Sequence, residues 1–330
     1  MVTHHTTHEI AVKAPADTVF ELIADVAGWP HVFGPTVHVD LLNDGPEQLL
    51  HIWAMANGEV RDWTSRRTLD RTKHRIAFQQ VVSSPPVARM AGEWIVEEDG
   101  EGGCEVTLLH DYEAIGDDEE AAEWIGKAVD RNSTAELAAL KTAAESVPGP
   151  VELRVTFHDE ETIEGRREQV FDFLNRADLW PERLPHVSRL ELTEHVTGVQ
   201  HMEMDTRSVD GSVHTTVSAR LCFPDRGVIL YKQLKVPPVM RSHTGRWELE
   251  AAADGKVVAR SWHTVTLDPE GVRAALGPDA TIAEAKEKVR HALGTNSRTT
   301  LRQAKEFVEG GGGGGAGDGG GGRGGDGAAS

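Results

Sequence analysis

The sequence contains the same pattern twice, and this repeat constrains the fold more than any other feature. The first half contains VFELIADVAGWP, and the second contains VFDFLNRADLWP at the matching place. Further pairs follow in the same order: Pro85-Pro86 with Pro237-Pro238, Trp94 with Trp247, His110 with His263, and Asn132-Ser133 with Asn296-Ser297. Because chance does not keep so many landmarks in order, we expect two tandem copies of one domain.

The repeat divides the 330 residues into two domains and a tail. The segment SVPGP, Ser146 to Pro150, has two prolines and a glycine, which predicts a linker after a helix. We therefore expect an N-terminal domain over 1–147 and a C-terminal domain over 150–309. Either half, at about 150 residues, is long enough to bury its own core. Residues 310–330 are dominated by glycine, which predicts a flexible, disordered tail.

Composition and charge exclude several classes of protein. Apolar residues make up 39% and charged residues 26%, as in an ordinary globular protein. The net charge of -19 argues against general nucleic-acid binding, which needs a basic surface. No apolar run approaches the roughly 18 residues that span a membrane, and the N-terminus does not resemble a signal peptide. With only Cys104 and Cys222, one in each half, we expect no disulfide and a cytoplasmic location.

Hydrophobic periodicity predicts the same elements in each copy. An alternating segment, HEIAVKAP or LRVTFHDE, is typical of a first strand, and a short helix follows it. Further alternating segments, separated by turn signals, predict an antiparallel meander. A long helix closes each copy, from about Glu119 to Ala144 in the first. The order is typical of an α+β helix-grip (START/Bet v 1-like) fold, in which a curved antiparallel sheet wraps the long helix around an internal, ligand-sized cavity.

A polar pair interrupts the apolar stripe of both long helices at the same point. The pair is Asn132-Ser133 in the first helix and Asn296-Ser297 in the second. One interpretation is a helix face that tolerates polar residues, and the other is a helical turn that faces the cavity. The repetition favours the second interpretation.

The strand EVRDWTSRRTLD carries the most informative polar residues. Alternation places Trp63, Ser65, Arg67 and Leu69 on one face, which we expect to point inward. The matching strand of the second copy directs Ser218 and Arg220 inward. A buried guanidinium needs a partner, so each arginine either bridges to a carboxylate across the sheet or binds a ligand oxygen in the cavity. For the repeated Ser-x-Arg motif both alternatives stay open.

Histidine, tyrosine and tryptophan residues complete the candidate sites. His110 and His263 recur on the last strand, and histidine suits proton transfer near neutral pH. Tyr231 and His243 occur only in the second copy, where the first has Phe78 and Met90, so the second cavity has more acid/base groups. Tryptophans could line the cavities, although most are expected in the core. They are Trp29, Trp53, Trp63, Trp94, Trp180, Trp247 and Trp262.

Other motifs are weak or absent. A basic cluster around the Ser-x-Arg strand is either solvated or a landing patch for an acidic partner; it contains Arg61, Arg66, Arg67, Arg71, Lys73 and Arg75. The sequence has no phosphate-binding glycine loop, nucleophile elbow or HExxH zinc motif. We therefore expect no metal.

Taken together, the motifs resemble a known family. The segments WPHVFGPTVHV, WTSRRTLD and PPVARMAGEW in the first half, with DLWPERLPHVSRLELTE, HTTVSARLC and GTNSRTTLRQA in the second, are similar to the di-domain aromatase/cyclases of type II polyketide synthases, of the actinorhodin type. The resemblance covers about residues 8–308 and implies a cyclase/dehydratase without a cofactor. The implied substrate is a poly-β-ketone, already reduced at one carbonyl, on an acyl carrier protein, and the other synthase components are implied partners. The implied reaction is first-ring aldol closure followed by dehydration.

The resemblance also assigns roles to residues. In single-domain relatives the serine and arginine of this strand bind and polarise the substrate, which implies such roles for Ser65 and Arg67, and through the repeat for Ser218 and Arg220. Those relatives carry a pocket tyrosine seven residues after the tryptophan of the Trp-Pro pair. Here that position is Thr36 or Val187, which shifts proton transfer toward His110 and His263.

Two alternatives to an enzyme remain from the sequence. One is a START-type module that binds a hydrophobic ligand without chemistry, and the other is a chaperone that only shapes the polyketide chain. The residues expected around the cavities, besides the six with implied catalytic roles, are Trp29, Trp63, Trp94, Asn132, Ser133, Tyr231, His243, Trp247 and Asn296.

Overall fold

The structure, a computed structural model, describes residues 2–56, 58–146, 149–207, 211 and 213–311. It consists of two domains, each with a seven-stranded antiparallel sheet and a long C-terminal helix. The predicted START/Bet v 1-like helix-grip architecture is therefore confirmed. The glycine-rich segment 312–330 and linker residues 147–148 lie outside the described residues.

The first domain begins with a strand and two short helices, continues with a six-stranded meander and ends with the long helix. The sheet order is β1-β7-β6-β5-β4-β3-β2, so the first strand pairs with the last. The elements are β1 (His4–Val12), α1 (Ala16–Ala24), α2 (Trp29–Val32), β2 (Thr36–Asp44), β3 (Glu47–Ala56), β4 (Glu59–Asp70), β5 (Arg75–Val82), β6 (Val87–Glu98), β7 (Cys104–Ala114) and α3 (Glu119–Ala144).

The second domain repeats this order with two additional short helices. Its sheet order is β8-β14-β13-β12-β11-β10-β9. The elements are α4 (Pro150–Leu153), β8 (Arg154–Glu164), α5 (Arg167–Asn175), α6 (Trp180–Arg183), β9 (Val187–Val196), β10 (Val199–Arg207), β11 (Val213–Phe223), β12 (Val228–Lys235), β13 (Met240–Ala251), β14 (Lys256–Leu267), α7 (Pro269–Leu276) and α8 (Ile282–Glu309).

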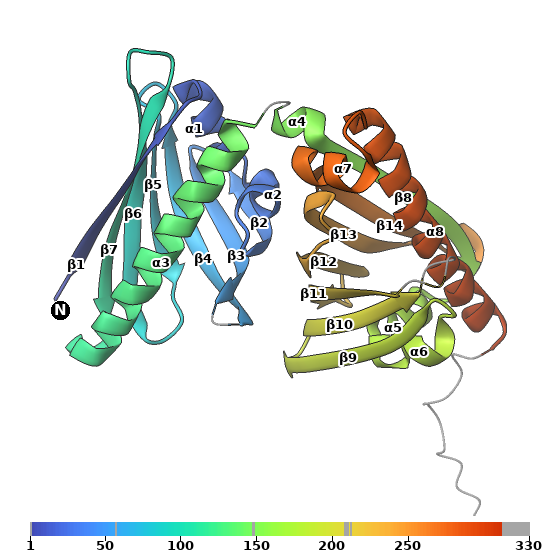
Figure 1. Ribbon diagram of the computed structural model, residues 1–330. Coiled ribbons are helices and arrows are strands. Elements are labelled where there is room, and N and C mark those ends of the chain that lie inside the picture. Colours follow the sequence, from blue (N-terminus) through green and yellow to red (C-terminus); the bar gives the residue numbers. More distant parts are fainter. Residues whose placement is uncertain (1, 57, 147–148, 208–210, 212, 312–330) are drawn as a thin grey trace, which may run out of the picture.

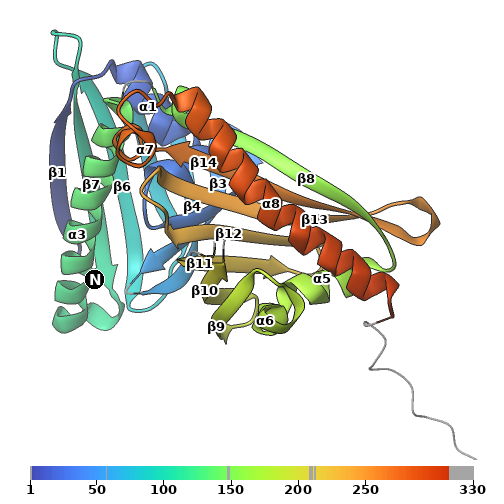
Figure 2. The same ribbon diagram turned by 45° about the vertical axis from the view of Figure 1, so that its right-hand side comes forward.

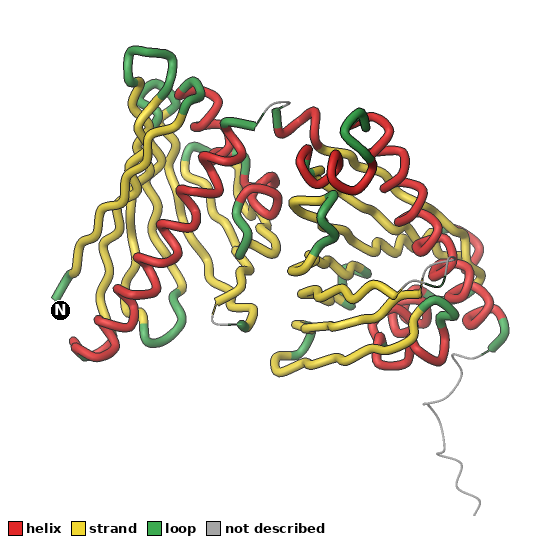
Figure 3. The backbone as a smooth tube through the Cα atoms, viewed as in Figure 1, coloured by secondary structure: helices red, strands yellow, loops and turns green. Residues whose placement is uncertain are grey.

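The two long helices begin where the sequence supplies caps. The Asp118 side chain accepts a hydrogen bond from the Ala121 amide at the start of α3, and Thr281 with Glu284 forms a capping box at the start of α8. The predicted bounds of the first long helix, Glu119 to Ala144, are confirmed. Figures 2 and 3 show each helix lying over its own sheet.

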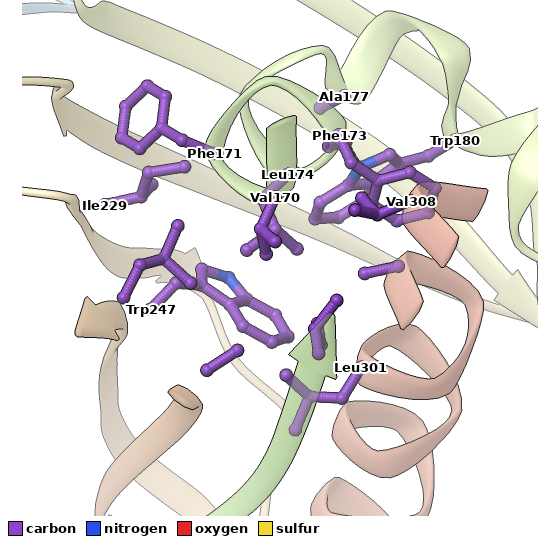
Figure 4. Packing of buried hydrophobic residues seen from close by; sticks show 14 of the residues in the cluster. Val170, Phe171, Phe173, Leu174, Ala177, Trp180, Ile229, Trp247, Leu301 and Val308 are labelled. Carbon is purple, nitrogen blue, oxygen red and sulfur yellow. Dashed lines mark hydrogen bonds between the residues drawn. The ribbon is translucent and has the colours of Figure 1, made fainter. Parts of the chain in front are cut away.

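The second domain's core joins α5, α6 and the end of α8 to the sheet. Trp180 and Trp247 lie in this cluster with Leu301 and Val308 of α8, all less than a tenth exposed (Figure 4). Helix α7, which the sequence analysis did not predict, caps the other end; its residue Val272 is fully buried. The apolar core thus fixes α8 at both ends and leaves its middle turn over the sheet.

The domains pack against each other through the outer faces of their sheets. Trp53 and Val37 of the first domain form one buried cluster with Ala219 and Leu221 of the second. Trp53 therefore does not line a cavity, as the sequence had left open, because its strand position points outward into this interface. Trp262 also lies outside both helix-grip cavities and stacks under the Arg246 guanidinium.

Candidate functional site

Each domain encloses a mostly apolar cavity between its sheet and its long helix. The first cavity has a volume of about 310 Å³ and the second about 440 Å³. Apart from Trp53 and Trp262, the residues predicted to line a cavity lie on its wall. In the first these are Trp29, Trp63, Ser65, Arg67, Trp94, His110, Asn132 and Ser133, and in the second Ser218, Arg220, Tyr231, His243, Trp247, His263 and Asn296. Their roles in chemistry remain predictions.

The register of the sheets confirms the alignment of the two copies around these residues. Arg67 lies opposite Phe78 on the neighbouring strand, and Arg220 lies opposite Tyr231. His110 and His263 each lie opposite a glycine. The two cavities therefore carry an arginine and a histidine at equivalent positions and differ in what surrounds them.

The Arg67 guanidinium holds the end of the first short helix. It donates hydrogen bonds to the carbonyls of Ile23 at 3.1 Å and Ala24 at 2.5 Å, and to Gln48 Oε1 at 2.8 Å. The last carbonyls of a helix lack partners within it and carry partial negative charge, which suits a cation. Burial lowers the pKa of Arg67 to about 10, so it stays charged at neutral pH.

Arg220 makes the equivalent contacts in the second domain. It donates to the Leu174 carbonyl of α5 at 2.7 Å and to Gln200 Oε1 at 2.8 Å, and it lies 5.1 Å from the Trp180 ring centre. Neither arginine forms an ion pair with a carboxylate in the described chain, so the alternative of a carboxylate bridge is wrong. Because a guanidinium has five donors, each arginine retains donors beyond these contacts.

Three polar rings meet in the second cavity. His263 Nδ1 lies 3.0 Å from the Tyr231 hydroxyl and 3.1 Å from His243 Nε2, and its Nε2 lies 3.4 Å from the Ser261 hydroxyl. Burial lowers the pKa of His263 to about 4, lowers that of His243 and raises that of Tyr231. All three are therefore neutral near pH 7, and the tyrosine hydroxyl can donate to an imidazole that accepts.

The first cavity has fewer polar side chains than the second at the equivalent positions. His110 Nδ1 lies 3.5 Å from the Ser133 hydroxyl of α3, and the ring packs edge-on to Phe78. Burial lowers the pKa of His110 to about 4. Phe78 and Met90 occupy the places of Tyr231 and His243, as the sequence comparison of the two copies predicted.

The polar turn of each long helix faces its cavity, as the second interpretation predicted. Ser133 and Ser297 are buried, and Ser297 donates to the Asp159 carboxylate at 2.6 Å. Asn132 and Asn296 lie on the cavity walls but remain exposed, which places them toward the openings.

Glu136 is a cavity residue that the sequence analysis missed. It lies on α3 one turn beyond Ser133 and lines the first cavity. Burial raises the pKa of its carboxyl to about 7, and no hydrogen bond or ion pair to it is found in the described chain. Its spacing could have identified it, because the residue four positions after Asn132 lies on the same face of the helix. The equivalent residue of the second domain is Thr300.

Comparisons with known proteins place the chain in a family. Residues 3–145 and 163–295 match two family descriptions of the same wording, "Polyketide cyclase / dehydrase and lipid transport". The chain is 44% identical over 312 residues to the actinorhodin polyketide synthase bifunctional cyclase/dehydratase of Streptomyces coelicolor, which covers 91% of this chain and 96% of that protein. The chain belongs to the di-domain polyketide cyclase/dehydratase family.

Other relatives agree with this di-domain cyclase/dehydratase assignment. The granaticin polyketide synthase bifunctional cyclase/dehydratase of Streptomyces violaceoruber is 41% identical, covering 93% of this chain and 94% of its own. Among solved structures, the di-domain ARO/CYC BexL from the BE-7585A biosynthetic pathway superposes with a TM-score of 0.83 at 50% identity, covering 93% of this chain and 99% of that chain. StfQ, from the steffimycin pathway, superposes with a TM-score of 0.76 at 33% identity, covering 94% and 98%.

Outside the cavities, the described surface of this cyclase/dehydratase shows no further candidate site of the kinds predicted from the sequence. In the basic cluster, Arg67 is buried and each other member lies within 4 Å of an acidic side chain, which leaves little unpaired positive charge. No cluster of metal-binding side chains occurs among the described residues. Within the same residues, no helix is long and apolar enough to cross a membrane.

Proposed function

We propose that this chain closes and aromatises the first ring of a ketoreduced poly-β-ketone held on an acyl carrier protein. The observation that carries the proposal is the pairing of an apolar, chain-sized cavity with buried groups that can exchange protons. A flexible polyketide needs such walls to bring its nucleophilic carbon near the carbonyl that it attacks. Family membership supports the same reaction class.

Aldol closure and dehydration both require proton transfer. A base removes a proton from a CH₂ group flanked by carbonyls, the resulting carbanion forms the C–C bond, and the new alkoxide takes a proton. Dehydration then removes a second carbon-bound proton, breaks the C–OH bond and delivers a proton to the departing hydroxide, which leaves as water. A group with a pKa near the working pH can both accept and donate a proton.

In the first cavity, Glu136 is the group best suited to this role. A carboxyl with a pKa of about 7 is present in both protonation states near neutral pH. Glu136 can therefore accept the carbon-bound proton and return it to the oxygen. His110, neutral and near Ser133, lines the same cavity and can orient a substrate oxygen. Arg67 lines the same cavity from β4, and its positive charge stabilises the enolate oxygen.

In the second cavity, we assign proton transfer to the cluster of Tyr231, His263 and His243. The neutral Tyr231 hydroxyl can donate to a carbonyl or departing hydroxyl, and the contact with His263 Nδ1 orients that hydroxyl. The Nδ1 atom of His243 is buried without a partner, which leaves it as an acceptor. The second cavity thus suits protonation of oxygen, with Arg220 again supplying positive charge.

The test is product analysis in a reconstituted system containing the minimal synthase, the ketoreductase and this chain. We expect a product with an aromatic first ring when the chain is present, and shunt products when it is omitted. Two variants take the residue that the other copy carries at the same position: Glu136→Thr for the first cavity and Tyr231→Phe for the second. Unchanged products with and without the chain would refute the function and favour a binding module.

A further inference from the structure

A third cavity lies between the two domains. Its volume is about 560 Å³, and residues of α2, α3 and the segment before β2 face residues of β8, β12 and β13 across it. Figure 1 shows α2 and β2 of the first domain turned toward β12 and β13 of the second. Pro35 and Met55 line this interdomain cavity and the first cavity alike, so the two spaces adjoin.

The walls of the interdomain cavity are basic in a chain of net charge -19. Its ionisable residues are His31, Arg154, Lys232 and Arg241, and none of its described lining residues is acidic. The pKa of His31 is lowered to about 3, by burial first and then by the charges of Arg154 and Lys232. Burial alone favours the neutral imidazole, and the charges of the two cations add to that effect.

Two of the cations are already bound to protein. Lys232 Nζ donates to three carbonyls of the first domain, those of Phe33, Gly34 and Thr36, at 2.6–3.1 Å. Arg241 contacts Asp268 and donates to the Ser146 hydroxyl. These two residues join the domains but add little free positive charge, because burial lowers the pKa of Lys232 to about 7 and Asp268 pairs with Arg241.

Arg154 has no such partner. No hydrogen bond or ion pair to its guanidinium is found within the described chain, and its Nε is completely buried without an acceptor. Asp25, in a neighbouring hollow, acts on it only as a nearby charge. Arg154 is only partly buried, so the rest of its guanidinium remains accessible, and its planar fork matches the oxygens of a phosphate. The site is thus built for an anion that the protein does not supply.

We propose that the interdomain cavity binds the phosphate of the phosphopantetheine arm that carries the substrate. This inference rests on the proposed function, because that arm links the polyketide to its carrier protein. Arg154 would hold the phosphate, and Pro35 and Met55, which line both spaces, mark the place where the acyl chain would pass toward the first cavity. The interface between the domains would then be the entry for the carried substrate, and this accounts for the contribution of both domains to its walls.

Calorimetric titration of the full chain with pantetheine 4′-phosphate, pantetheine and inorganic phosphate tests the site. We expect pantetheine 4′-phosphate to bind at least tenfold more tightly than the other two, because a charge-assisted hydrogen bond supplies about that factor or more. Arg154→Met should remove the difference. Arg302→Met, which removes an exposed arginine of α8, should keep it. Equal binding of inorganic phosphate would indicate a site for free anions and would overturn the proposal, as would an unchanged Arg154→Met variant.

Kinetics separates this proposal from the proposed function. With Arg154→Met, KM for the carrier-bound substrate should rise at least tenfold at similar kcat, while KM for a phosphate-free pantetheine thioester stays the same. Equal effects on both substrates would refute the phosphate contact. If the wild type converts neither substrate, the proposed function fails, and the titration still decides whether Arg154 binds phosphate. The melting temperature of Arg154→Met should not fall, because the side chain has no partner to lose.

Discussion

Arg220 provides the sharpest stability prediction, because the structure gives it a defined structural role. Its side chain is 1% exposed and donates to the Leu174 carbonyl and to Gln200. In Arg220→Met, two buried acceptors lose their donor at about 1–3 kcal/mol each, and the contact with Trp180 is worth about 0.5–2 kcal/mol more. Relief from desolvating the charge offsets part of this loss. We expect a net destabilisation of about 3 kcal/mol.

Thermal unfolding followed by circular dichroism measures this effect. For a domain of about 160 residues, a loss of 3 kcal/mol corresponds to a decrease in Tm of about 6–12 °C. Arg302→Met, at an exposed position on α8, should leave Tm within about 2 °C. An unchanged or higher Tm for Arg220→Met would refute the reasoning, and the guanidinium would then be free for substrate alone. Product analysis of an arginine variant is therefore informative only if its fold is retained.

Three further predictions concern packing, pH and the domain interface. In Gly245→Ala the new Cβ would lie 2.3 Å from the Tyr231 ring, so we expect about 1–3 kcal/mol of destabilisation in thermal unfolding; a Tm equal to wild type would contradict this. His110 and His263 have folded pKa values of about 4, below the 6.5 of an unfolded histidine, so the free energy of unfolding should fall as pH drops from 6.5 to 4. Urea unfolding at pH 7 and pH 5 checks this, and a midpoint that does not decrease would oppose it. Lys232→Met leaves three interface carbonyls without their donor, so calorimetry should separate the domain transitions; a single unchanged transition would argue against this.

Local periodicity and the internal repeat predicted the fold and the position of the site residues. Alternation along β4 directed Ser65 and Arg67 inward, and both are buried. The helical stripe fixed α3, and the repeated Asn-Ser pair identified the turn that faces the cavity. These features depend on residues near one another in sequence, or on the comparison of the two copies, so a single sequence contains them.

Features that depend on tertiary contacts could not be predicted from the sequence. The partners of Arg67 are backbone carbonyls at the end of α1, and no side chain marks them. Trp53 faces outward on its strand, yet the second domain buries it. The raised pKa of Glu136 depends on its partial burial in the first cavity. In each case the deciding contact comes from a segment distant in sequence.

The central claim is that side chains lining the cavities transfer protons and do not only shape the substrate. Single-turnover rates of first-ring aromatisation, on one carrier-bound substrate at pH 7, test this most directly for wild type and Glu136→Gln. Glu120→Gln, an exposed residue of the same helix, is the control. The account predicts a rate at least about 100-fold lower for Glu136→Gln, with the fold and substrate binding retained. Equal rates would contradict this claim. The first cavity would then only shape the substrate, and the reaction would proceed without proton transfer by Glu136.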